Sequence, residues 1–132
     1  MNAPLSWPCP CGTGLAYDAC CGRLHRGAAQ AETAEELMRS RYAAYALRNE
    51  DHVFRTWHPR TRPDRIDLEP ATTWTGLRIL DTEAGGVDDE SGVVEFAAAW
   101  THAGKPGVLR ERSRFERRAG RWVYVDGDVI RG

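Results

Sequence analysis

The sequence predicts an α+β domain in which helices come first and an antiparallel sheet follows. Apolar residues recur at helical spacing from residue 33 to residue 48, and from residue 73 onward they alternate with a period of two. Segments rich in Gly separate the alternating stretches and supply the turns between strands. Helices and strands that are segregated along the chain indicate an α+β arrangement rather than an alternating α/β fold.

Length and charge limit the class of protein. The chain has 132 residues and a net charge of −1, which suits one domain with a small appendage. A charge so close to zero gives no general attraction to nucleic acid or to an anionic membrane. No apolar stretch reaches the ~18 residues of a membrane span, and the N-terminus lacks the basic and apolar regions of a signal peptide. We therefore expect a cytoplasmic protein with no membrane partner.

Two helices are predicted ahead of the sheet. The first covers residues 33–48, where Thr33 and Glu36 have the spacing of a capping box. Asn49 is the expected stop signal of this helix. A second, shorter helix is predicted over residues 50–57, because its apolar residues fall on one side and a proline follows it.

Four strands are predicted to form an antiparallel meander. The segments that alternate are 73–80, 92–102, 108–118 and 121–129. Alternate residues of a strand share one face, so the same pattern predicts which side chains point into the core. Across the last turn this parity predicts three opposed pairs: Phe115 with Trp122, Ser113 with Tyr124, and Glu111 with Asp126.

A polar pocket follows from this register. Glu111 and Asp126 would face each other on a concave surface, where two carboxylates repel. Arg41 occupies a position of helix 33–48 at which the periodicity predicts an apolar residue, and a buried guanidinium must be paired. We therefore expect Arg41 to bridge to Glu111 or Asp126. The other residues expected around this pocket are Tyr42, Tyr45, Trp57, His58, Trp74, Trp100, His102, Ser113 and Tyr124.

The pocket has two interpretations. Coupled acids with nearby histidines can transfer protons, which would make the pocket catalytic. The same groups can instead form a buried ion-pair network or hold a ligand without chemistry. The pattern favours the structural or ligand-binding role. It does not decide whether the protein is an enzyme, but it favours a protein that is not.

All four cysteines lie in the N-terminal segment 1–27, which lacks the apolar periodicity needed for a core of its own. Cys9, Cys11, Cys20 and Cys21 have the spacing C-x-C-x8-C-C, and four thiolates from two short segments can surround a zinc ion tetrahedrally. Disulfides are disfavoured in a reducing compartment, and a redox motif would show C-x-x-C. We expect one structural zinc ion, with a redox centre or an iron–sulfur site as the alternatives.

His25 follows the last cysteine by four residues and has two interpretations. It is either a substitute ligand or, as we favour, a surface or neighbouring imidazole beside the metal site. Four thiolates leave no coordination position for water, so the metal itself is not expected to be catalytic.

The stretch CPCGTGLAYDACCG, residues 9–22, resembles the SEC-C motif, a small zinc-binding element named for the C-terminus of the SecA translocation ATPase. The continuation, residues 37–63, is similar to the YchJ-like family of uncharacterised bacterial proteins. This resemblance implies a zinc knuckle over residues 1–27. It also implies, over residues 28–132, a domain like nuclear transport factor 2 and ketosteroid isomerase, a cone of helices on a curved antiparallel sheet.

The expected function is that of a zinc-stabilised binding or adaptor protein of unknown cellular role, whose knuckle docks a protein partner. The resemblance supports docking, since in SecA the motif binds a chaperone partner. Nucleic acid is the less favoured partner, and a homodimer is a further expectation by analogy with the open sheets of cone folds. The alternative is a small-molecule-binding protein or enzyme that uses the pocket around Arg41, Glu111 and Asp126.

Overall fold

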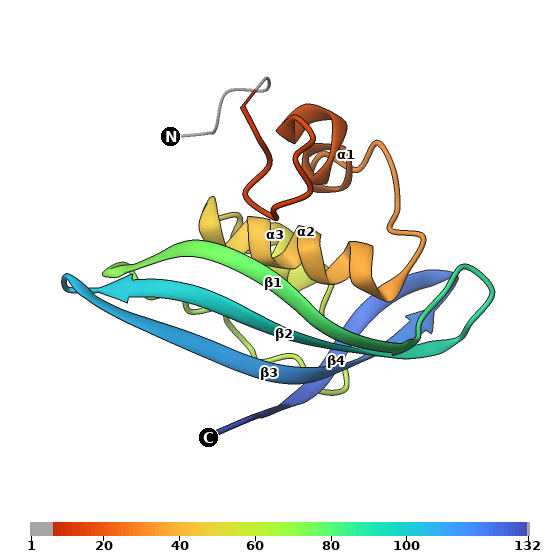
Figure 1. Ribbon diagram of the computed structural model, residues 1–132. Helices are drawn as coiled ribbons and strands as arrows, with labels where there is room; N and C mark the ends of the chain where they lie inside the picture. The colour runs from red at the N-terminus through yellow and green to blue at the C-terminus, as the bar shows by residue number, and fades with distance from the viewer. Residues whose placement is uncertain (1–6, 132) are drawn as a thin grey trace.

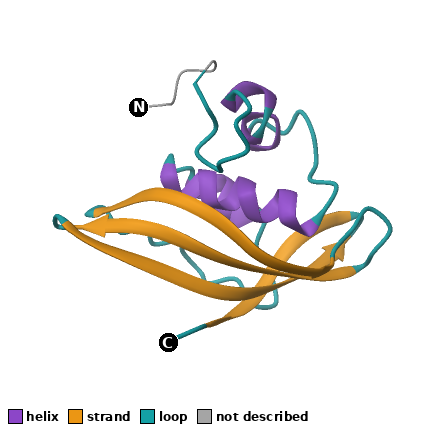
Figure 2. Cartoon of the chain, in the orientation of Figure 1, coloured by secondary structure: helices purple, strands orange, loops and turns teal. Residues whose placement is uncertain are grey.

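The computed structural model describes residues 7–131, and these form the α+β architecture that the sequence predicts (Figure 2). The first six residues of the predicted knuckle, and Gly132, lie outside the described residues. The elements in chain order are the 3₁₀ turn η1 (Tyr17–Ala19), helices α1 (Cys21–His25), α2 (Ala34–Ala46) and α3 (Glu50–Arg55), and strands β1 (Thr72–Ala84), β2 (Ser91–His102), β3 (Lys105–Arg118) and β4 (Arg121–Val129).

The strands form one antiparallel sheet in the order β1-β2-β3-β4. Figure 1 shows that the sheet curves and that helix α2 lies along its concave face. The N-terminal segment that contains η1 and α1 covers the side of α2 that faces away from the sheet. We call residues 7–27 the knuckle and the remainder the cone.

Helix α2 begins as the capping box predicts, with one difference. The Thr33 hydroxyl accepts a hydrogen bond from the Glu36 amide at 3.1 Å, which satisfies one of the free amides of the first turn. The Glu36 carboxylate returns to the amide of Glu32, at 2.8 Å, rather than to that of Thr33. The cap therefore ties the helix to the residue before its N-cap.

The stop signal predicted at Asn49 is wrong. Helix α2 ends at Ala46, and Arg48 is the residue in the left-handed region, with φ of 60°. Asn49 instead begins the next helix, because its side-chain oxygen accepts a hydrogen bond from the His52 amide at 3.1 Å. One short connection thus ends α2 and caps α3.

Tight turns set the register of the last three strands. Ala103-Gly104 joins β2 to β3, and Ala119-Gly120 joins β3 to β4, with all four residues at positive φ. Two-residue loops of this kind match the right-handed twist of the strands that they connect.

The register predicted across the last turn is wrong. The two-residue turn places Phe115 opposite Tyr124, two positions beyond the predicted partner, and Val125 then forms a bulge in β4. Beyond the bulge, Arg114 lies opposite Asp126 and binds it at 2.5 Å, on the exposed face of the sheet. Glu111 and Asp126 therefore do not face each other, because an extra residue changes the parity of the strand.

The core lies between α2 and the sheet. Leu37, Met38 and Tyr42 of α2 are buried with Phe96 of β2 and Phe115 of β3. Each such side chain contributes about 1.5–3 kcal/mol when it leaves water. This packing fixes α2 above the sheet and so positions the polar side chains that the helix directs toward it.

Candidate functional site

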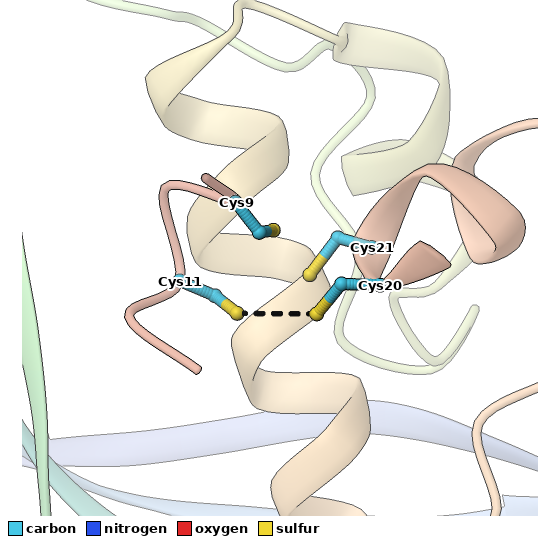
Figure 3. Close-up of side chains that lie close together, drawn as sticks. All are labelled: Cys9, Cys11, Cys20 and Cys21. Carbon is cyan, nitrogen blue, oxygen red and sulfur yellow. Dashed lines mark hydrogen bonds between the residues drawn. The ribbon is translucent and has the colours of Figure 1, made fainter. Parts of the chain in front are cut away.

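The four cysteines form one buried cluster. Cys9 and Cys11 come from the loop before η1, and Cys20 and Cys21 come from the turn into α1. Figure 3 shows the four side chains converging over helix α2. Their sulfur atoms all lie within 4.8 Å of one another, and no disulfide joins them. The Sγ atoms of Cys11 and Cys20 are 3.6 Å apart.

This donor set fits a tetrahedral metal ion. Bonds of about 2.3 Å to four sulfur ligands place the sulfur atoms about 3.8 Å apart, close to the separations found here. Hydrogen bonds from Cys21 and Cys9 lower the pKa of Cys11, whereas hydrogen bonding to Cys11 raises the pKa of Cys9 to about 11 and also raises the pKa of Cys21. One sulfur therefore ionises at the expense of its neighbours, and a cation is needed for all of them to be thiolates.

The loop between the cysteine pairs supports the cluster. The hydroxyl of Thr13 lies 3.2 Å from the sulfur of Cys20 and 3.7 Å from that of Cys11. Gly12 turns the chain with φ of +87°, a conformation that side chains with a Cβ rarely adopt. The turn thus aims a hydroxyl at two of the four sulfur atoms.

His25 is not a surface residue, and its ring nitrogens face groups other than the cysteine sulfur atoms. It is buried, and both ring nitrogens are engaged: Nδ1 lies 2.6 Å from the Tyr17 hydroxyl, and Nε2 lies 2.8 Å from the Ser40 carbonyl. Burial lowers the pKa of His25. The imidazole therefore joins the knuckle to α2.

Arginines add further bonds between the knuckle and the helices. Arg39 of α2 donates to the carbonyl of Cys11 at 2.6 Å, and Arg55 of α3 donates to the carbonyl of His25 at 2.7 Å. Arg23 of α1 binds the Glu36 carboxylate at 2.7 Å. These contacts hold the cysteine cluster against the cone.

A cavity of about 250 Å³ lies between α2 and the sheet, and we call it the cone cavity. Eight of the residues predicted around a pocket line it: Arg41, Tyr42, Tyr45, Trp57, Trp74, Glu111, Ser113 and Tyr124. Sequence reasoning did not assign the other four lining residues, Met38, Phe96, Ala98 and Leu109, to the pocket. Strand parity already places Phe96 and Ala98 on the inner face, so the sequence did contain a signal for these two lining residues.

Four predicted pocket residues do not line the cone cavity. His58 lies beside Glu116, with 4.0 Å between Nε2 and the carboxylate, and His102 is exposed and hydrogen bonded to Thr72. Trp100 pairs with Gly107 of β3, and its indole occupies the space that a side chain at residue 107 would fill, outside the cone cavity. The bulge in β4 places Asp126 on the exposed face.

Arg41 does not form the predicted ion pair. Its side chain is 3% exposed, and Nη1 donates to the Val53 carbonyl at 3.0 Å and to the Thr56 hydroxyl at 2.8 Å. The guanidinium stacks on Trp57 and Tyr124, with 5.0 and 4.6 Å to the ring centroids. It makes no salt bridge with any carboxylate among residues 7–131. Burial lowers the pKa of Arg41, and cation–π contacts compensate part of that cost.

Glu111 is held by hydroxyl groups rather than by a cation. Its Oε2 accepts hydrogen bonds from Ser113 at 2.6 Å and from Tyr124 at 3.0 Å. Gly127 lies opposite Ser113 on β4, and a Cβ there would come within 2.3 Å of Oε2. The absence of a side chain at residue 127 therefore makes room for the carboxylate. Sequence reasoning missed this role of Gly127, although an isolated glycine in a strand is a recognised signal of close approach.

The outer face of the sheet carries arginines that are matched by acids. Arg110 and Arg112 bind Glu95 at 2.5 and 3.0 Å, and Arg114 binds Asp126. Paired guanidinium groups offer little to a phosphate backbone. In the described part of the chain, no helix is long and apolar enough to cross a membrane.

Family models match both parts of the chain. A model described as the middle NTF2-like domain of YchJ matches residues 33–127, and the SEC-C motif matches residues 8–23. A UPF0225 protein of Streptomyces coelicolor is 53% identical over 123 residues, which cover 93% of this chain and 96% of that protein. A UPF0225 protein of Deinococcus radiodurans is 52% identical over 130 residues, 95% of each chain.

Two solved structures share the fold. The solution structure of a SEC-C motif containing protein from Rhodopseudomonas palustris has a TM-score of 0.82 and 35% identity, and the match covers 99% of this chain and 100% of that one. The crystal structure of a SEC-C motif containing protein from Psychrobacter arcticus has a TM-score of 0.76 and 27% identity, with coverage of 97% and 86%. The chain therefore belongs to the YchJ-like, UPF0225 family, with a SEC-C motif ahead of a nuclear-transport-factor-2-like domain.

Proposed function

We propose that this protein binds a small molecule in the cone cavity and that its cysteine cluster holds a structural zinc ion. The observation that carries the binding proposal is the buried guanidinium of Arg41, which lines the cavity without an acidic partner among the described residues. A buried charge is costly unless it is neutralised, and ligand sites combine apolar walls with a few convergent polar groups. A ligand would complete the environment of Arg41.

Zinc is the metal that the cluster suits best. Four soft sulfur ligands at tetrahedral separations favour zinc, and such closed sites are structural. When bound, the ion would link the loop of Cys9 and Cys11 to the start of α1. A reducing cytoplasm is part of this proposal, because the four thiols form no disulfide.

We propose binding rather than catalysis. No imidazole is among the described residues that line the cone cavity, so the histidines expected for proton transfer lie elsewhere. Glu111 already accepts two hydrogen bonds on one carboxylate oxygen, an arrangement that suits a fixed acceptor.

Docking of a protein or nucleic acid by the knuckle stays a prediction, as does a homodimer. The basic residues that would face a partner are engaged within the chain: Arg23 binds Glu36 and Arg26 binds Asp18, each at 2.7 Å. The geometry therefore favours the cavity over the knuckle as the functional site.

A matched pair of cavity variants tests the proposal. Ala98 lines the cavity and is 2% exposed, whereas its neighbour Ala97 points to the opposite face of β2. In a thermal-shift screen of a metabolite library, ligands should raise the Tm of the wild type and of Ala97→Leu, but not that of Ala98→Leu, in which the cavity is filled. A library that shifts no variant, or that shifts Ala98→Leu equally, would refute binding in the cavity.

A further inference from the structure

Arg41 presents an unused edge next to the cone cavity. Its Nη1 is engaged by Val53 and Thr56, whereas Nε and Nη2 donate to no acceptor in the part of the chain that the structure describes. The Nε and Nη2 edge of a guanidinium is a planar fork that matches the two oxygens of a carboxylate. The indole Nε1 of Trp57, which stacks on Arg41, is also buried without a hydrogen-bond partner.

Glu111 presents an unused acceptor to the same cavity. Both of its hydrogen bonds fall on Oε2, and Oε1 accepts none from residues 7–131. The two donors, Ser113 and Tyr124, hold the carboxylate in one orientation. Oε1 is therefore available to a donor on a ligand.

Tyr124 separates these two polar points. Its ring stacks on Arg41 at 4.6 Å, and its hydroxyl, at the far end of the side chain, donates to Glu111 at 3.0 Å. The guanidinium therefore lies over the Tyr124 ring, whereas the carboxylate lies at its hydroxyl, so the two polar points are separate. A ligand that satisfies both needs an acceptor at one end and a donor at the other.

The rest of the cavity is aromatic and small. Tyr45 and Trp74 meet edge to face, with 6.4 Å between centroids, and Trp57 closes another wall. The volume of about 250 Å³ corresponds to roughly eight waters at about 30 Å³ each. Aromatic walls favour a flat ring, which they contact by stacking and edge-to-face packing.

We infer that the ligand is a small aromatic monocarboxylate that carries a hydroxyl or amino donor opposite its carboxylate, an assignment that rests on the proposed binding function. The carboxylate accepts from the free edge of Arg41, the ring occupies the aromatic part of the cavity, and the donor binds Oε1 of Glu111. A phosphate dianion fits less well, because its second charge would face the Glu111 carboxylate. A cation fits less well because it would face Arg41.

Three small benzene derivatives test the proposed ligand class by isothermal titration calorimetry on the full, zinc-loaded chain. Para-aminobenzoate has both polar ends, benzoate lacks the donor, and para-toluidine lacks the carboxylate. Para-aminobenzoate should bind at least about tenfold more tightly than either partial analogue, since each lost hydrogen bond to a charged group costs that much.

Variants assign each end of the ligand. Arg41→Gln should abolish the preference for para-aminobenzoate over para-toluidine, while Arg78→Gln, on an exposed position of β1, should leave it unchanged. Should Arg41→Gln fail to fold by circular dichroism, Arg41→Lys keeps the charge without the fork and should lose most of the preference.

Glu111→Gln tests the donor end. The hydroxyls of Ser113 and Tyr124 should hold the amide oxygen where Oε2 lies, so the amide NH2 would face the amine of the probe. The preference for para-aminobenzoate over benzoate should disappear. Glu116→Gln, on the same strand but outside the cavity, should preserve it.

Two results would overturn the assignment. If para-toluidine binds as tightly as para-aminobenzoate, or if none of the probes binds at millimolar concentration while the metabolite screen finds other cavity ligands, the ligand class is wrong and the binding function stands. If the screen finds no ligand whose Tm shift is lost in Ala98→Leu, the proposed binding function itself is wrong, and no ligand class can be assigned.

Discussion

The rings of His25 and His52 lie 4.5 Å apart where the knuckle meets the cone, and burial lowers the pKa of both. Arg55 lies 3.1 Å from Nδ1 of His52 and can only donate, so Nε2 carries the proton and donates to the Ser40 hydroxyl at 2.9 Å. Protonating either ring would place a positive charge beside the Arg55 guanidinium. The junction is therefore built from neutral imidazoles.

Acid should destabilise the protein through His52. Burial, followed by repulsion from His25 when that ring is protonated and from Arg55, lowers the pKa of His52 from 6.5 to about 2. Below about pH 6.5 the unfolded chain binds a proton that the folded chain does not, so stability falls as the pH falls, by up to about 1.4 kcal/mol per pH unit from this residue. His52→Gln keeps one donor and one acceptor on the side chain without titrating, so the stability of this variant should depend less on pH.

Urea unfolding between pH 5 and pH 7, with zinc in excess, measures this slope. His102→Gln is the control, because His102 is exposed on the far end of β2 and should keep the wild-type slope. Identical slopes for the wild type and both variants would contradict the assignment.

Metal analysis should give one zinc per chain by the four-thiolate geometry. Cys11→Ser should lower that content, whereas His25→Gln should not, because His25 is bonded to Tyr17 and Ser40 instead of to the metal. Chelation should speed amide hydrogen exchange in the knuckle and leave the sheet protected, since the cone has its own core. Full zinc content in Cys11→Ser would argue against a four-cysteine site.

Gly127→Ala should destabilise the sheet and disturb the cavity. The new Cβ would come within 2.3 Å of Oε2 of Glu111, which must move, and overpacking of this kind costs about 1–3 kcal/mol. Gly76→Ala is the matched control, because a Cβ at Gly76 of β1 meets no atom within 4 Å. Chemical denaturation of both variants checks the difference, and equal stabilities would show that Gly127 is not needed to accommodate Glu111.

Ala119→Asn should stabilise the last hairpin. Ala119 has φ of 52°, in the left-handed region that costs an alanine more than an asparagine, and Asn-Gly is the preferred sequence of such turns. We expect a gain of about 0.5–1 kcal/mol in the free energy of unfolding. Ala28→Asn, at an exposed residue without positive φ, should give no gain.

The sequence predicts the elements well because their signals are local. Periodicity located both main helices and all four strands, and the four-cysteine spacing located the buried cluster. The position of Arg41 on an otherwise apolar helix face indicated a buried guanidinium, which the structure has, but the ion pair predicted with Glu111 or Asp126 does not form among the described residues.

The partners of these residues could not be predicted, since they depend on register and on backbone irregularities. A two-residue turn and the bulge at Val125 changed the neighbours of Glu111, and strand parity alone contains neither. Arg41 found its acceptors at Val53 and Thr56, whose positions depend on how α3 packs against α2.

The bulge at Val125 also decides which acids the cavity contains. If β4 paired without the bulge, Val125 would lie opposite Arg114 and Asp126 would lie opposite Ser113, on the same face as Glu111. A second carboxylate would then face the cavity. The charge of the cavity is thus set by one backbone irregularity as much as by the side chains of its walls.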